Sequence, residues 1–568
     1  MPTLPAAGER ILICVAWPYA HSATHVGQIA GSMLPGDIFA RYQRMAGREV
    51  LMVSGSDMHG TPITVEADRQ GVTPHTLAAR YHEQISDVLR RLGISLDVYT
   101  STVTENHYRQ TQQIFLRLLE QGLLLRDTME SPYCPTDQRF LPDRYVEGIC
   151  PYCECAEARG DQCHSCGRTL DPAQLLEPRC RLCGSQGIEI RSTEHFFLDL
   201  PQLQEHLRIW LAECAGWWRP NALNFALSWI RDGLRPRAIT RDLEWGVPVP
   251  VPGFEDKRIY VWFDAVIGYL SASIEWAERV GQPSAWRQWW EMDARGQAPS
   301  RAYYFVGKDN IAFHTIFWPA ILMGLRSLTL PYDVPANEYV VMGGAKASAS
   351  RGNVIWTRDV LDRYGPDALR FYLASVLPES ADTLFTYEEL VRRHNDELLA
   401  TYGNAAHRVL TFVQRHFGGR VPTPGALRPA DQAVLAELGN GFTAVGAAIE
   451  AVRLREALAA AMAVARAANR YLESQAPWKR LRDDPGDAAT SIFTMLQVLN
   501  GLKTLFVPFV PHSSQRLHEL LGFAGDIARL RWAPESVPTG QPLPAPRPLF
   551  AKLEAPVPDG AALPWANR

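Results

Sequence analysis

The N-terminal part of the chain alternates short apolar runs with a helical pattern. Residues 11–16 form an apolar run that predicts a buried strand, and residues 29–46 follow with the apolar spacing of a helix. A second strand-like run covers residues 50–54. Because strand, helix and strand in this order are typical of a doubly wound parallel sheet, we expect a βαβ unit at the start of the fold.

The strand pattern stops at a cysteine-rich segment and resumes after it. This segment covers residues 121–194, and strand-like runs return at residues 258–263 and 302–306. We therefore expect a sheet that is split by an insertion. From residue 387 to about residue 521 the pattern is helical throughout, with alanine-rich amphipathic stretches such as residues 454–472, and a proline-rich tail follows.

The composition is that of a soluble protein with several domains. At 568 residues the chain is long enough for about three or four domains, and its 46% hydrophobic and 21% charged residues are ordinary values. Glu9 and Arg10 lead directly into the first strand, without the apolar segment of a signal peptide. No apolar run approaches the roughly 20 residues that cross a bilayer. We expect a soluble, cytoplasmic protein with no membrane partner.

The net charge of −4 gives no reason to expect a nucleic-acid partner, but the charge is unevenly distributed. Between Glu389 and Arg482, 13 lysines and arginines stand against 8 aspartates and glutamates. A basic helical segment of this kind suits a surface that binds phosphates. It suits a solvated, arginine-rich helix face equally well, so charge alone leaves both interpretations open.

Two pairs of cysteines have the spacing of a metal site. Cys150 and Cys153 form one C-x-x-C pair, Cys163 and Cys166 form another, and nine residues lie between the pairs. Two thiolates three residues apart on a tight turn can bind the same tetrahedral zinc ion, and two such turns complete its ligand shell. Disulfides are the alternative, but thiols stay reduced in a cytosolic protein. The spacing therefore predicts a closed structural Zn2+ site.

A second, outer set of residues surrounds this pattern. Cys134 is followed at the same spacing by Asp137, and Cys180 and Cys183 form a further C-x-x-C pair. An aspartate oxygen is an acceptable zinc ligand, although carboxylates are uncommon in closed structural sites. This set therefore predicts either a second zinc site or an empty one. The remaining cysteines have no assigned role: Cys14, Cys155 and Cys214.

Several short motifs occur in a fixed order along the chain. They are Ala16-Trp17-Pro18-Tyr19 with His25-Val26-Gly27-Gln28, then Ser56-Asp57-Met58-His59-Gly60-Thr61-Pro62, Phe140-Leu141-Pro142-Asp143-Arg144, Val261-Trp262-Phe263-Asp264-Ala265 and Gly307-Lys308-Asp309. Each motif is modest evidence by itself. Together and in this order they resemble the methionyl-tRNA synthetases, a family of class I aminoacyl-tRNA synthetases, over nearly the whole chain.

The resemblance implies a fold class and a domain order. The fold is α/β: a Rossmann-type doubly wound parallel sheet split by a zinc-knuckle insertion, followed by an all-α anticodon-binding domain. The expected domains are residues 9–121 and 258–336 as the two halves of the nucleotide-binding catalytic domain, 122–257 as the connective insertion with the zinc knuckle, 337–388 as a linker with a mobile loop, 389–540 as the helical anticodon-binding domain and 541–568 as a C-terminal tail.

Such an enzyme joins methionine to ATP as methionyl adenylate and releases pyrophosphate. Negative charge spreads over the transferred phosphoryl group, so catalysis is mostly positioning and electrostatic stabilisation, with Mg2+ bound to ATP. A helix that starts just after His25 would offer backbone N–H groups to phosphate, and Gly27 would allow close approach. Without the resemblance, His25 would more often be a surface or capping residue. The implied ATP-binding residues are His25, Gly27, Gln28, Lys308, Asp309, Lys346, Ser348 and Ser350, and the implied catalytic group is His25, Gln28, Lys308, Lys346 and Arg351.

The resemblance also implies a methionine pocket. Asp57 would bind the α-ammonium group, and aromatic side chains would surround the polarizable thioether. The implied pocket residues are Trp17, Tyr19, Asp57, Trp262, Ala265, Val266, Tyr269 and His314. Without the resemblance, Trp262 and Tyr269 would be interpreted as core residues.

Three residues of the helical region correspond to positions that read the CAU anticodon in this family. Asn404 and Arg408 are four residues apart and so share one helix face, from which both can address base edges. Trp478 can stack on an unpaired base. As an alternative, Trp478 is a packing residue at a helix boundary.

Two motifs depart from the family pattern. Gln28 stands where the family usually has histidine, and glutamine can donate a hydrogen bond to phosphate but carries no charge. The mobile-loop signature reads Lys346-Ala347-Ser348-Ala349-Ser350, so its second lysine is replaced by Ala349. Loss of one donor to developing charge typically costs about 10²–10³ in rate. Arg351, the next residue, can restore the positive charge if it points inward.

These features together predict a methionine–tRNA ligase that is a monomer and has tRNA(Met), ATP and L-methionine as its partners. The altered signatures leave two alternatives. The first is a catalytically impaired or specialised synthetase paralogue, and the second is a non-catalytic relic that still binds tRNA. A complete methionine pocket argues against the relic, because a protein that binds only tRNA has no physical need for one.

Overall fold

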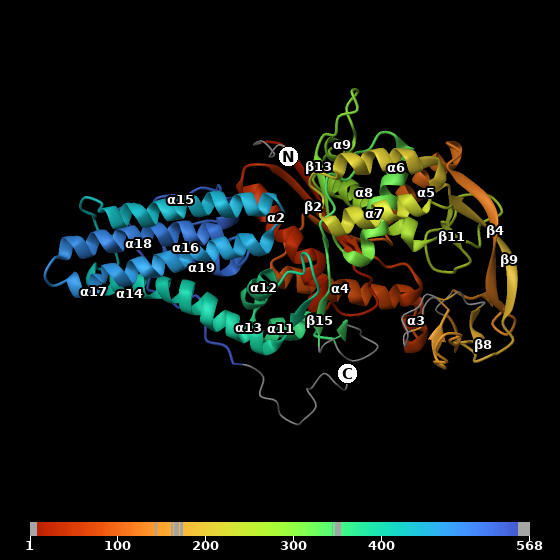
Figure 1. Cartoon of the computed structure of the whole chain (residues 1–568), viewed down its shortest axis with the longest axis horizontal. Coiled ribbons are helices and arrows are strands. Elements are labelled where there is room, and N and C mark those ends of the chain that lie inside the picture. Colours follow the sequence, from red (N-terminus) through yellow and green to blue (C-terminus); the bar gives the residue numbers. More distant parts are fainter. Residues whose placement is uncertain are drawn as a thin grey trace.

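The computed structural model describes residues 8–142, 145–160, 163, 170, 174–342, 345–346 and 354–554 of the 568-residue chain. Three parts follow one another along the longest axis: a helical bundle, an α/β body, and a long two-stranded arm (Figure 1). The α/β body therefore lies between the other two parts.

The α/β body is built on a five-stranded parallel sheet with the strand order β14–β13–β1–β2–β3. Its strands are β1 (Arg10–Val15), β2 (Glu49–Ser56), β3 (Val98–Ser101), β13 (Arg301–Gly307) and β14 (Ala336–Asn337). The chain leaves the sheet after β3 and returns to it at β13. The expected doubly wound sheet, split by an insertion, is confirmed.

Both faces of this sheet are covered, which explains why its strands read as continuous apolar runs. Ile11 and Ile13 point into a core shared with helices on one face, whereas Leu12 and Cys14 point into a second core on the other. The helices of the first face include α2 (Leu34–Met45) and α4 (Pro74–Leu92), and those of the second include α5 (Glu105–Glu120) and α8 (Val261–Arg279). Side chains that alternate along β1 thus serve two different cores.

The helix that follows β1 begins earlier than its apolar pattern predicts. It starts as α1 (Val26–Gln28), continues as the π-helical stretch η1 (Ile29–Met33) and then becomes α2. The prediction of a helix over residues 29–46 is confirmed in substance. The three extra residues place the start of the helix directly after His25, which has extended backbone angles and is the N-cap residue.

The insertion forms the arm. Its strands β4 and β9 pair antiparallel from Leu124 and Leu198 to Tyr133 and Glu189, and a small sheet of order β7–β6–β8 lies at the far end (Figure 1). The strands are β4 (Leu124–Cys134), β5 (Arg139–Phe140), β6 (Val146–Ile149), β7 (Ala158–Arg159), β8 (Leu176–Cys180), β9 (Glu189–Leu198) and β10 (Arg237–Ala238). Every cysteine proposed as a zinc ligand that the structure describes lies in this distal part.

The prediction of a strand over residues 258–263 is wrong. Only β12 (Arg258–Ile259) is extended there, and the helix α8 begins at Val261. The error has a physical cause, because α8 is apolar around most of its circumference and 13 of its 19 residues are buried. A helix buried on several sides has no amphipathic period, and a short apolar run of this kind cannot be told from a buried strand.

The remaining elements complete the body and connect it to the bundle. The helices are α3 (Thr61–Gln70), α6 (Leu200–Cys214), α7 (Pro220–Asp232), α9 (Arg287–Trp290), α10 (Trp318–Leu325), α11 (Thr357–Tyr364) and α12 (Pro366–Ser375), with η4 (Lys308–Asn310) and η5 (Phe313–Phe317). The strands are β11 (Thr240–Arg241), β15 (Val340–Met342), β16 (Ala345–Lys346) and β17 (Thr383–Phe385). The last three pair in the order β16–β15–β17 and form a separate small sheet.

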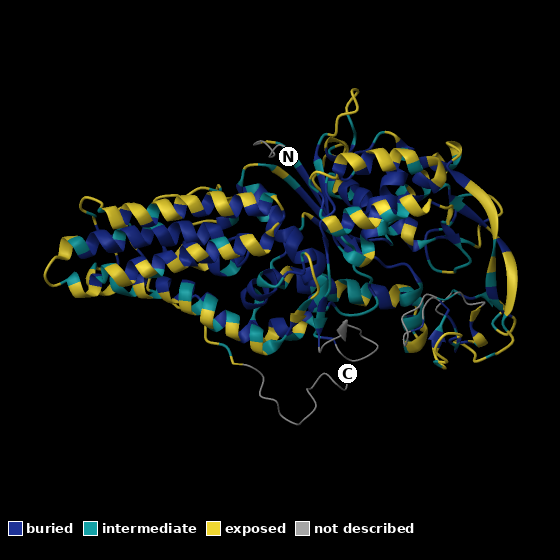
Figure 2. Cartoon of the chain, viewed as in Figure 1, coloured by how far each residue is buried: buried dark blue, intermediate teal, exposed yellow. Residues whose placement is uncertain are grey.

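The C-terminal part is a helical bundle, as predicted. Its helices are α13 (Tyr387–Arg393), η7 (His394–Gly403), α14 (Asn404–His416), α15 (Pro429–Glu450), α16 (Leu454–Gln475), α17 (Pro477–Arg480), α18 (Pro485–Phe506) and α19 (Pro511–Leu520), followed by η8 (Ile527–Arg529). Buried residues line the inside of the bundle and exposed residues its outer surface (Figure 2). The apolar pair Leu549 and Phe550 lies back against the bundle, where the Phe550 ring packs on Gly403.

Among the residues that the structure describes, no helix is both long and apolar enough to cross a membrane.

Candidate functional site

The candidate site lies where the central strands of the parallel sheet end. The strand order reverses between β1 and β13, and ligands of open α/β sheets bind at such a reversal, beyond the carboxyl ends of the strands. A cavity of about 320 Å³ occupies this position. It is lined by Ala16, Trp17, Pro18, Tyr19, Thr24, His25, Gly27, Gln28, Gly31, Ser32, Met33, Ile85, Leu89, Gly307, Asp309, Asn310, Glu338, Tyr339 and Val340.

The first signature forms the wall of this cavity at the start of α1. The side chain of Gln28 folds back, and its Oε1 accepts a hydrogen bond of 3.0 Å from the backbone N–H of His25. A Cβ atom on Gly27 would lie 3.0 Å from the His25 ring, so a larger residue would require this ring to shift. Gln28 thus stabilises the helix start through its oxygen, which leaves its amide nitrogen as the group able to donate to a ligand.

Lys308 lies at the end of β13 and is held by two carboxylates. Its Nζ atom is 2.8 Å from Glu338 Oε2 and 2.8 Å from Asp382 Oδ1, and it also lies over the ring of Tyr339. Burial alone would lower the pKa of Lys308, but the two carboxylates raise it above its usual value. The Lys308 ammonium group has three N–H donors, so the two carboxylates leave one donor for a further acceptor such as phosphate. The neighbouring Asp309 accepts a hydrogen bond from Tyr339.

Asp57 follows β2 and is buried, with only 3% of its surface exposed. Its Oδ1 accepts a hydrogen bond of 3.1 Å from the backbone N–H of His59. Burial, followed by the negative charge of Asp264, raises the pKa of Asp57 well above its usual value. A cation bound beside Asp57 would remove much of this penalty, so the position suits a carboxylate that binds an ammonium group.

A buried network of side chains lies behind Asp57. His59 Nδ1 is 2.5 Å from one oxygen of Asp264, and His107 Nε2 contacts the other. On its other side, His107 Nδ1 lies 2.8 Å from Ser271 Oγ. Burial would raise the pKa of Asp264, but the two histidines outweigh it and hold the pKa at about 2. Sequence reasoning assigned no role to this network, although His59 and Asp264 lie inside two of the quoted motifs.

Tyr269 and His314 are joined by a second buried contact. The Tyr269 hydroxyl is 2.7 Å from His314 Nε2, and His314 Nδ1 is 2.8 Å from the carbonyl oxygen of Asn310. Since a carbonyl only accepts, Nδ1 carries the proton and Nε2 accepts from the tyrosine. Burial lowers the pKa of His314 to about 4, so this histidine is neutral at physiological pH.

The other predicted pocket residues divide into two groups: Trp17 and Tyr19 line the 320 Å³ cavity, whereas Trp262, Ala265 and Val266 lie on α8 and do not line it. The Trp17 ring packs between β2 and α8, where added Cβ atoms on Gly55 or Gly268 would lie 2.5 Å and 2.8 Å from it. Tyr19 lies beside Asp57 and lines the same cavity as Trp17. Trp262 is 44% exposed and lines a different cavity, of about 220 Å³. Ala265 and Val266 follow it on α8.

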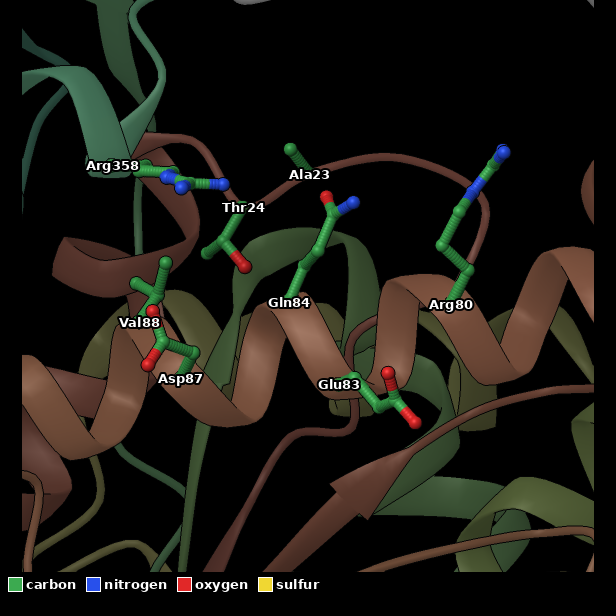
Figure 3. A pocket seen from close by; sticks show the side chains of 8 residues that line it. All are labelled: Ala23, Thr24, Arg80, Glu83, Gln84, Asp87, Val88 and Arg358. Atoms are coloured by element: carbon green, nitrogen blue, oxygen red, sulfur yellow. The ribbon is translucent and has the colours of Figure 1, made fainter.

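Another cavity, of about 290 Å³, shares Thr24 with the first (Figure 3). Helix α4 forms its floor, and Arg358 of α11 reaches over it from one side. Its lining residues are Ala23, Thr24, Arg80, Glu83, Gln84, Asp87, Val88 and Arg358. Two arginines and two acidic residues balance one another, so the cavity has no net charge that would select an anion.

The cysteine-rich segment brings potential metal ligands together. The sulfur atoms of Cys150, Cys153 and Cys163 lie within 4.8 Å of one another, and the Cys153 and Cys163 sulfurs are 3.6 Å apart. Zinc–sulfur bonds of about 2.3 Å in a tetrahedron place two sulfurs about 3.8 Å apart, so this spacing fits a zinc ion. The fourth predicted ligand, Cys166, lies outside the described residues.

The outer set is also brought together. Ligand atoms of Cys134, Asp137, Cys180 and Cys183 all lie within 4.8 Å of one another. The Cys134 and Cys183 sulfurs are 3.5 Å apart, and Cys180 Sγ is 3.0 Å from Asp137 Oδ2. Four donors at these distances fit a small tetrahedral cation such as zinc, with one carboxylate in place of a thiolate.

The three predicted anticodon residues lie at the end of the bundle far from the sheet. Asn404 and Arg408 are both exposed on α14, and Trp478 of α17 is 42% exposed. The Arg408 guanidinium lies 4.8 Å from the centre of the Trp478 ring. A surface that combines a flat aromatic ring with a stacked cation and an amide suits unpaired bases.

Most of the predicted mobile loop lies outside the described residues. Ser348, Ala349, Ser350 and Arg351 belong to that part of the chain. For Lys346 the structure gives only the backbone, which forms β16 with Ala345.

The fold and site define a nucleotide-binding α/β protein with an appended helical domain. The family described as tRNA synthetases class I (M) matches residues 11–410, and the anticodon binding domain of methionyl tRNA ligase matches residues 421–565. The first match covers more than half of the chain, so the chain belongs to the class I tRNA synthetases of the methionyl type.

Similar proteins cover nearly the whole chain. A methionine–tRNA ligase of Roseiflexus sp. (strain RS-1) is 52% identical over 575 residues, covering 96% of this chain and 97% of the relative. A methionine–tRNA ligase of Thermomicrobium roseum is 51% identical with the same coverage. Among solved structures, Mycobacterium tuberculosis methionyl-tRNA synthetase in complex with methionyl-adenylate has a TM-score of 0.78 at 25% identity, covering 96% of this chain and all of the other.

Proposed function

We propose that this chain is a methionine–tRNA ligase, which activates methionine with ATP and transfers it to tRNA(Met). One observation carries the proposal. At the carboxyl edge of the parallel sheet, His25 at the start of α1 lines the 320 Å³ cavity, and the buried Asp57, after β2, lies beside Tyr19, which lines the same cavity. This edge therefore offers both a phosphate-binding helix start and a partner for an α-ammonium group.

In the first step the methionine carboxylate attacks the α-phosphate of ATP, and pyrophosphate leaves. Asp57 binds the ammonium group, which orients the carboxylate, while Tyr19, Trp17 and the neutral Tyr269–His314 pair shape the pocket for the thioether. Trp262 would complete that pocket by turning towards it from its exposed position.

The ATP phosphates would be bound at the opposite side of the cavity. His25 and the Gln28 amide donate to them, and Gly27 allows the close approach. Lys308 and Asp309, at the end of β13, are proposed to contact the nucleotide. The mobile-loop residues complete the site from the remaining side: Lys346, Ser348, Ser350 and Arg351. Mg2+ would neutralise part of the phosphate charge, which suits a cavity bordered by the carboxylates of Asp309 and Glu338.

In the second step the methionyl group passes to the terminal adenosine of tRNA. The proposed readers of the anticodon are Asn404, Arg408 and Trp478. Trp478 would stack on one base while Arg408, already stacked on Trp478, and Asn404 hydrogen-bond to base edges or phosphates. The exposure of all three side chains supports this role, since a packing residue would be buried.

The distal arm is proposed to bind two structural Zn2+ ions. Cys150, Cys153, Cys163 and Cys166 would hold one, and Cys134, Asp137, Cys180 and Cys183 the other. The ions would close the ends of an arm that has only a small apolar core. Thiolate ligands require a reducing compartment, so we place the protein in the cytoplasm.

We propose that the protein acts as a monomer. One chain supplies both the cavity residues and the anticodon residues, so no second copy is needed to complete either site.

Aminoacylation tests the proposal directly. The purified chain is incubated with ATP, Mg2+, labelled methionine and a tRNA(Met) transcript, and methionyl-tRNA is measured as acid-precipitable label. The proposal expects rapid charging of the CAU transcript and much slower charging when the anticodon is altered. Binding of the transcript without any charging would contradict it and favour a tRNA-binding relic.

A further inference from the structure

We propose that Arg219 is a positioning residue that fixes the anticodon-reading helices relative to the ATP cavity. This inference rests on the proposed ligase function. Arg219 is the N-cap residue of α7, far in sequence from both sites, and no motif marks it. Its guanidinium nevertheless contacts both the edge strand of the catalytic sheet and the helical bundle.

The first set of contacts leads to the cavity. Arg219 Nη1 donates to the side-chain oxygen of Asn337 at 2.7 Å, at the end of β14. The Asn337 amide nitrogen donates in turn to the carbonyl oxygen of Gly31 at 2.9 Å. Gly31 lies in the π-helical stretch η1 and lines the cavity. Asn337 is 1% exposed, so both of its hydrogen bonds are shielded from water and strongly directional.

The second set of contacts leads to the bundle. Arg219 Nη2 donates to the carbonyl oxygen of Val452 at 2.8 Å, in the turn between α15 and α16. Glu379 binds the same turn, where its Oε1 accepts from the backbone N–H of Leu454 at 2.7 Å and of Arg455 at 3.3 Å. A carboxylate at the first residues of α16 matches the positive end of that helix. The turn is therefore held from two sides by opposite charges.

The backbone of this turn is constrained. Val452 has a φ of 52°, in the left-handed region that β-branched residues avoid. Such a conformation persists only where the surroundings fix it, and here the carbonyl of Val452 is bound by Arg219. Ala476, just after α16, also has a positive φ, of 39°. The helix is thus bounded at both ends by strained non-glycine residues.

Helix α16 connects this turn to the anticodon residues. It has 22 residues and so spans about 33 Å, from Leu454 beside the turn to Gln475, three residues before Trp478. Near its far end, Asn469 donates to the carbonyl oxygen of Thr401 at 2.7 Å, three residues before Asn404. On a rod of this length, a tilt of 5° at the turn moves the far end by about 3 Å, which is enough to break base contacts.

The test compares two RNA substrates in the full-length enzyme. One is the tRNA(Met) transcript, and the other is an acceptor-stem minihelix that has no anticodon. Arg219→Met removes the guanidinium and keeps the length of the chain. Arg231→Met is the matched control, because Arg231 is an exposed arginine on the same helix α7. Methionine-dependent exchange of pyrophosphate into ATP is measured on each preparation.

We expect Arg219→Met to lower kcat/KM for the full tRNA about tenfold, while minihelix charging and pyrophosphate exchange stay within about twofold of the parent. Arg231→Met should change none of the three rates. Arg219 is proposed to position the contact that Trp478 makes with the anticodon, so the two substitutions should not act independently. In the double variant Arg219→Met/Trp478→Ala, the fold-decrease in kcat/KM for tRNA charging should be smaller than the product of the fold-decreases of the two single variants. Glu379→Gln, which keeps the shape of the second contact, should show the same selective loss to a smaller degree.

Two results would overturn the inference. Equal losses with both RNAs would mean that Arg219 only stabilises the catalytic body, and unchanged rates with both would mean that the contact does not position the bundle. If Arg219→Met does not fold, the same three rates are measured with Arg219→Lys. Lysine keeps the charge but can reach only one of the two acceptors, Asn337 Oδ1 or the Val452 carbonyl oxygen, so the same selective loss is expected. Absence of exchange in the parent enzyme would instead refute the ligase function itself.

Discussion

The candidate residues at the sheet include buried ones, such as Asp57, Tyr269 and His314, whereas the three candidate residues of the bundle are all exposed. Asp57 is 3% exposed and depends on a loop after β2 for its position, while Trp478 is 42% exposed on a short helix at the end of the molecule. The sheet site is assembled from four separate strand ends. The bundle site is assembled from two helices, α14 and α17, which meet where Arg408 lies over the Trp478 ring.

The difference fits what each region is proposed to bind. A small amino acid can be enclosed, and exclusion of water strengthens its contact with a carboxylate. A folded tRNA is too large to enclose, so its bases must reach side chains that already lie on the surface. Mutations in the sheet should therefore have large effects on activation, and mutations in the bundle should have smaller effects that need tRNA to be seen.

The largest effect is expected for Asp57→Asn. The substitution keeps the shape but removes the charge that pairs with the α-ammonium group, and such buried pairs are worth about 2–5 kcal/mol. The KM for methionine in pyrophosphate exchange should rise at least about 30-fold. The KM for ATP and the affinity for tRNA should change little, so they serve as the controls. A methionine KM within about threefold of the parent would contradict the role of Asp57.

A smaller effect is expected for Trp478→Ala. Base–aromatic stacking is worth about 1–3 kcal/mol, so kcat/KM for tRNA(Met) charging should fall about 5- to 150-fold. Pyrophosphate exchange without tRNA should not change, because Trp478 lies at the far end of the bundle. Trp478→Phe should recover much of the loss. A fall in exchange would show that this residue acts on folding and not on tRNA.

The pH dependence of stability should show the buried state of His314. Its pKa of about 4 lies below the ordinary value of 6.5, so the unfolded chain takes up a proton more readily. The stabilisation is complete above pH 6.5 and is lost as the pH falls towards 4, by about 3 kcal/mol. Thermal unfolding of the parent and His314→Gln between pH 7 and 4 measures this, and their difference in midpoint should narrow as the pH falls. A constant difference would contradict the buried, neutral histidine.

The smallest effect is expected for the outer cysteine set. Asp137→Cys converts its ligands to four thiolates, so the ion should be bound more firmly with no change in activity. Zinc measured by mass spectrometry should be two per chain in both proteins, and the variant should lose its second ion at a higher chelator concentration. A single zinc in the parent, and two in the variant, would show that Asp137 does not complete a site.

Sequence patterns predicted the parts of the fold that depend on local periodicity. The strand over residues 11–16, the split sheet and the helical bundle follow from runs and periods that each segment carries by itself. The cysteine pairs three residues apart were also predictable, because that spacing is local, and the structure brings together every predicted ligand that it describes. The start of α8 was not, since a helix buried on several sides has the same apolar run as a strand.

Contacts between distant residues were outside the reach of this reasoning. The pairing of Lys308 with Glu338 and Asp382 depends on how β13, β14 and β17 are arranged in space, and no local sequence pattern predicts it. The same holds for Arg219, whose acceptors lie more than 100 residues further along the chain. For Gln28, sequence reasoning missed a local contact. It predicted a hydrogen bond to phosphate, but it did not predict that Gln28 Oε1 accepts from the backbone N–H of His25 at the helix start.

Methionine-dependent exchange of labelled pyrophosphate into ATP, with Mg2+ and without tRNA, tests the central claim most directly. It isolates the chemistry at the sheet, where Gln28 and Ala349 replace the usual signature residues. We predict brisk exchange with methionine and none without an amino acid. No exchange above an enzyme-free control, from folded and zinc-loaded protein, would contradict the account.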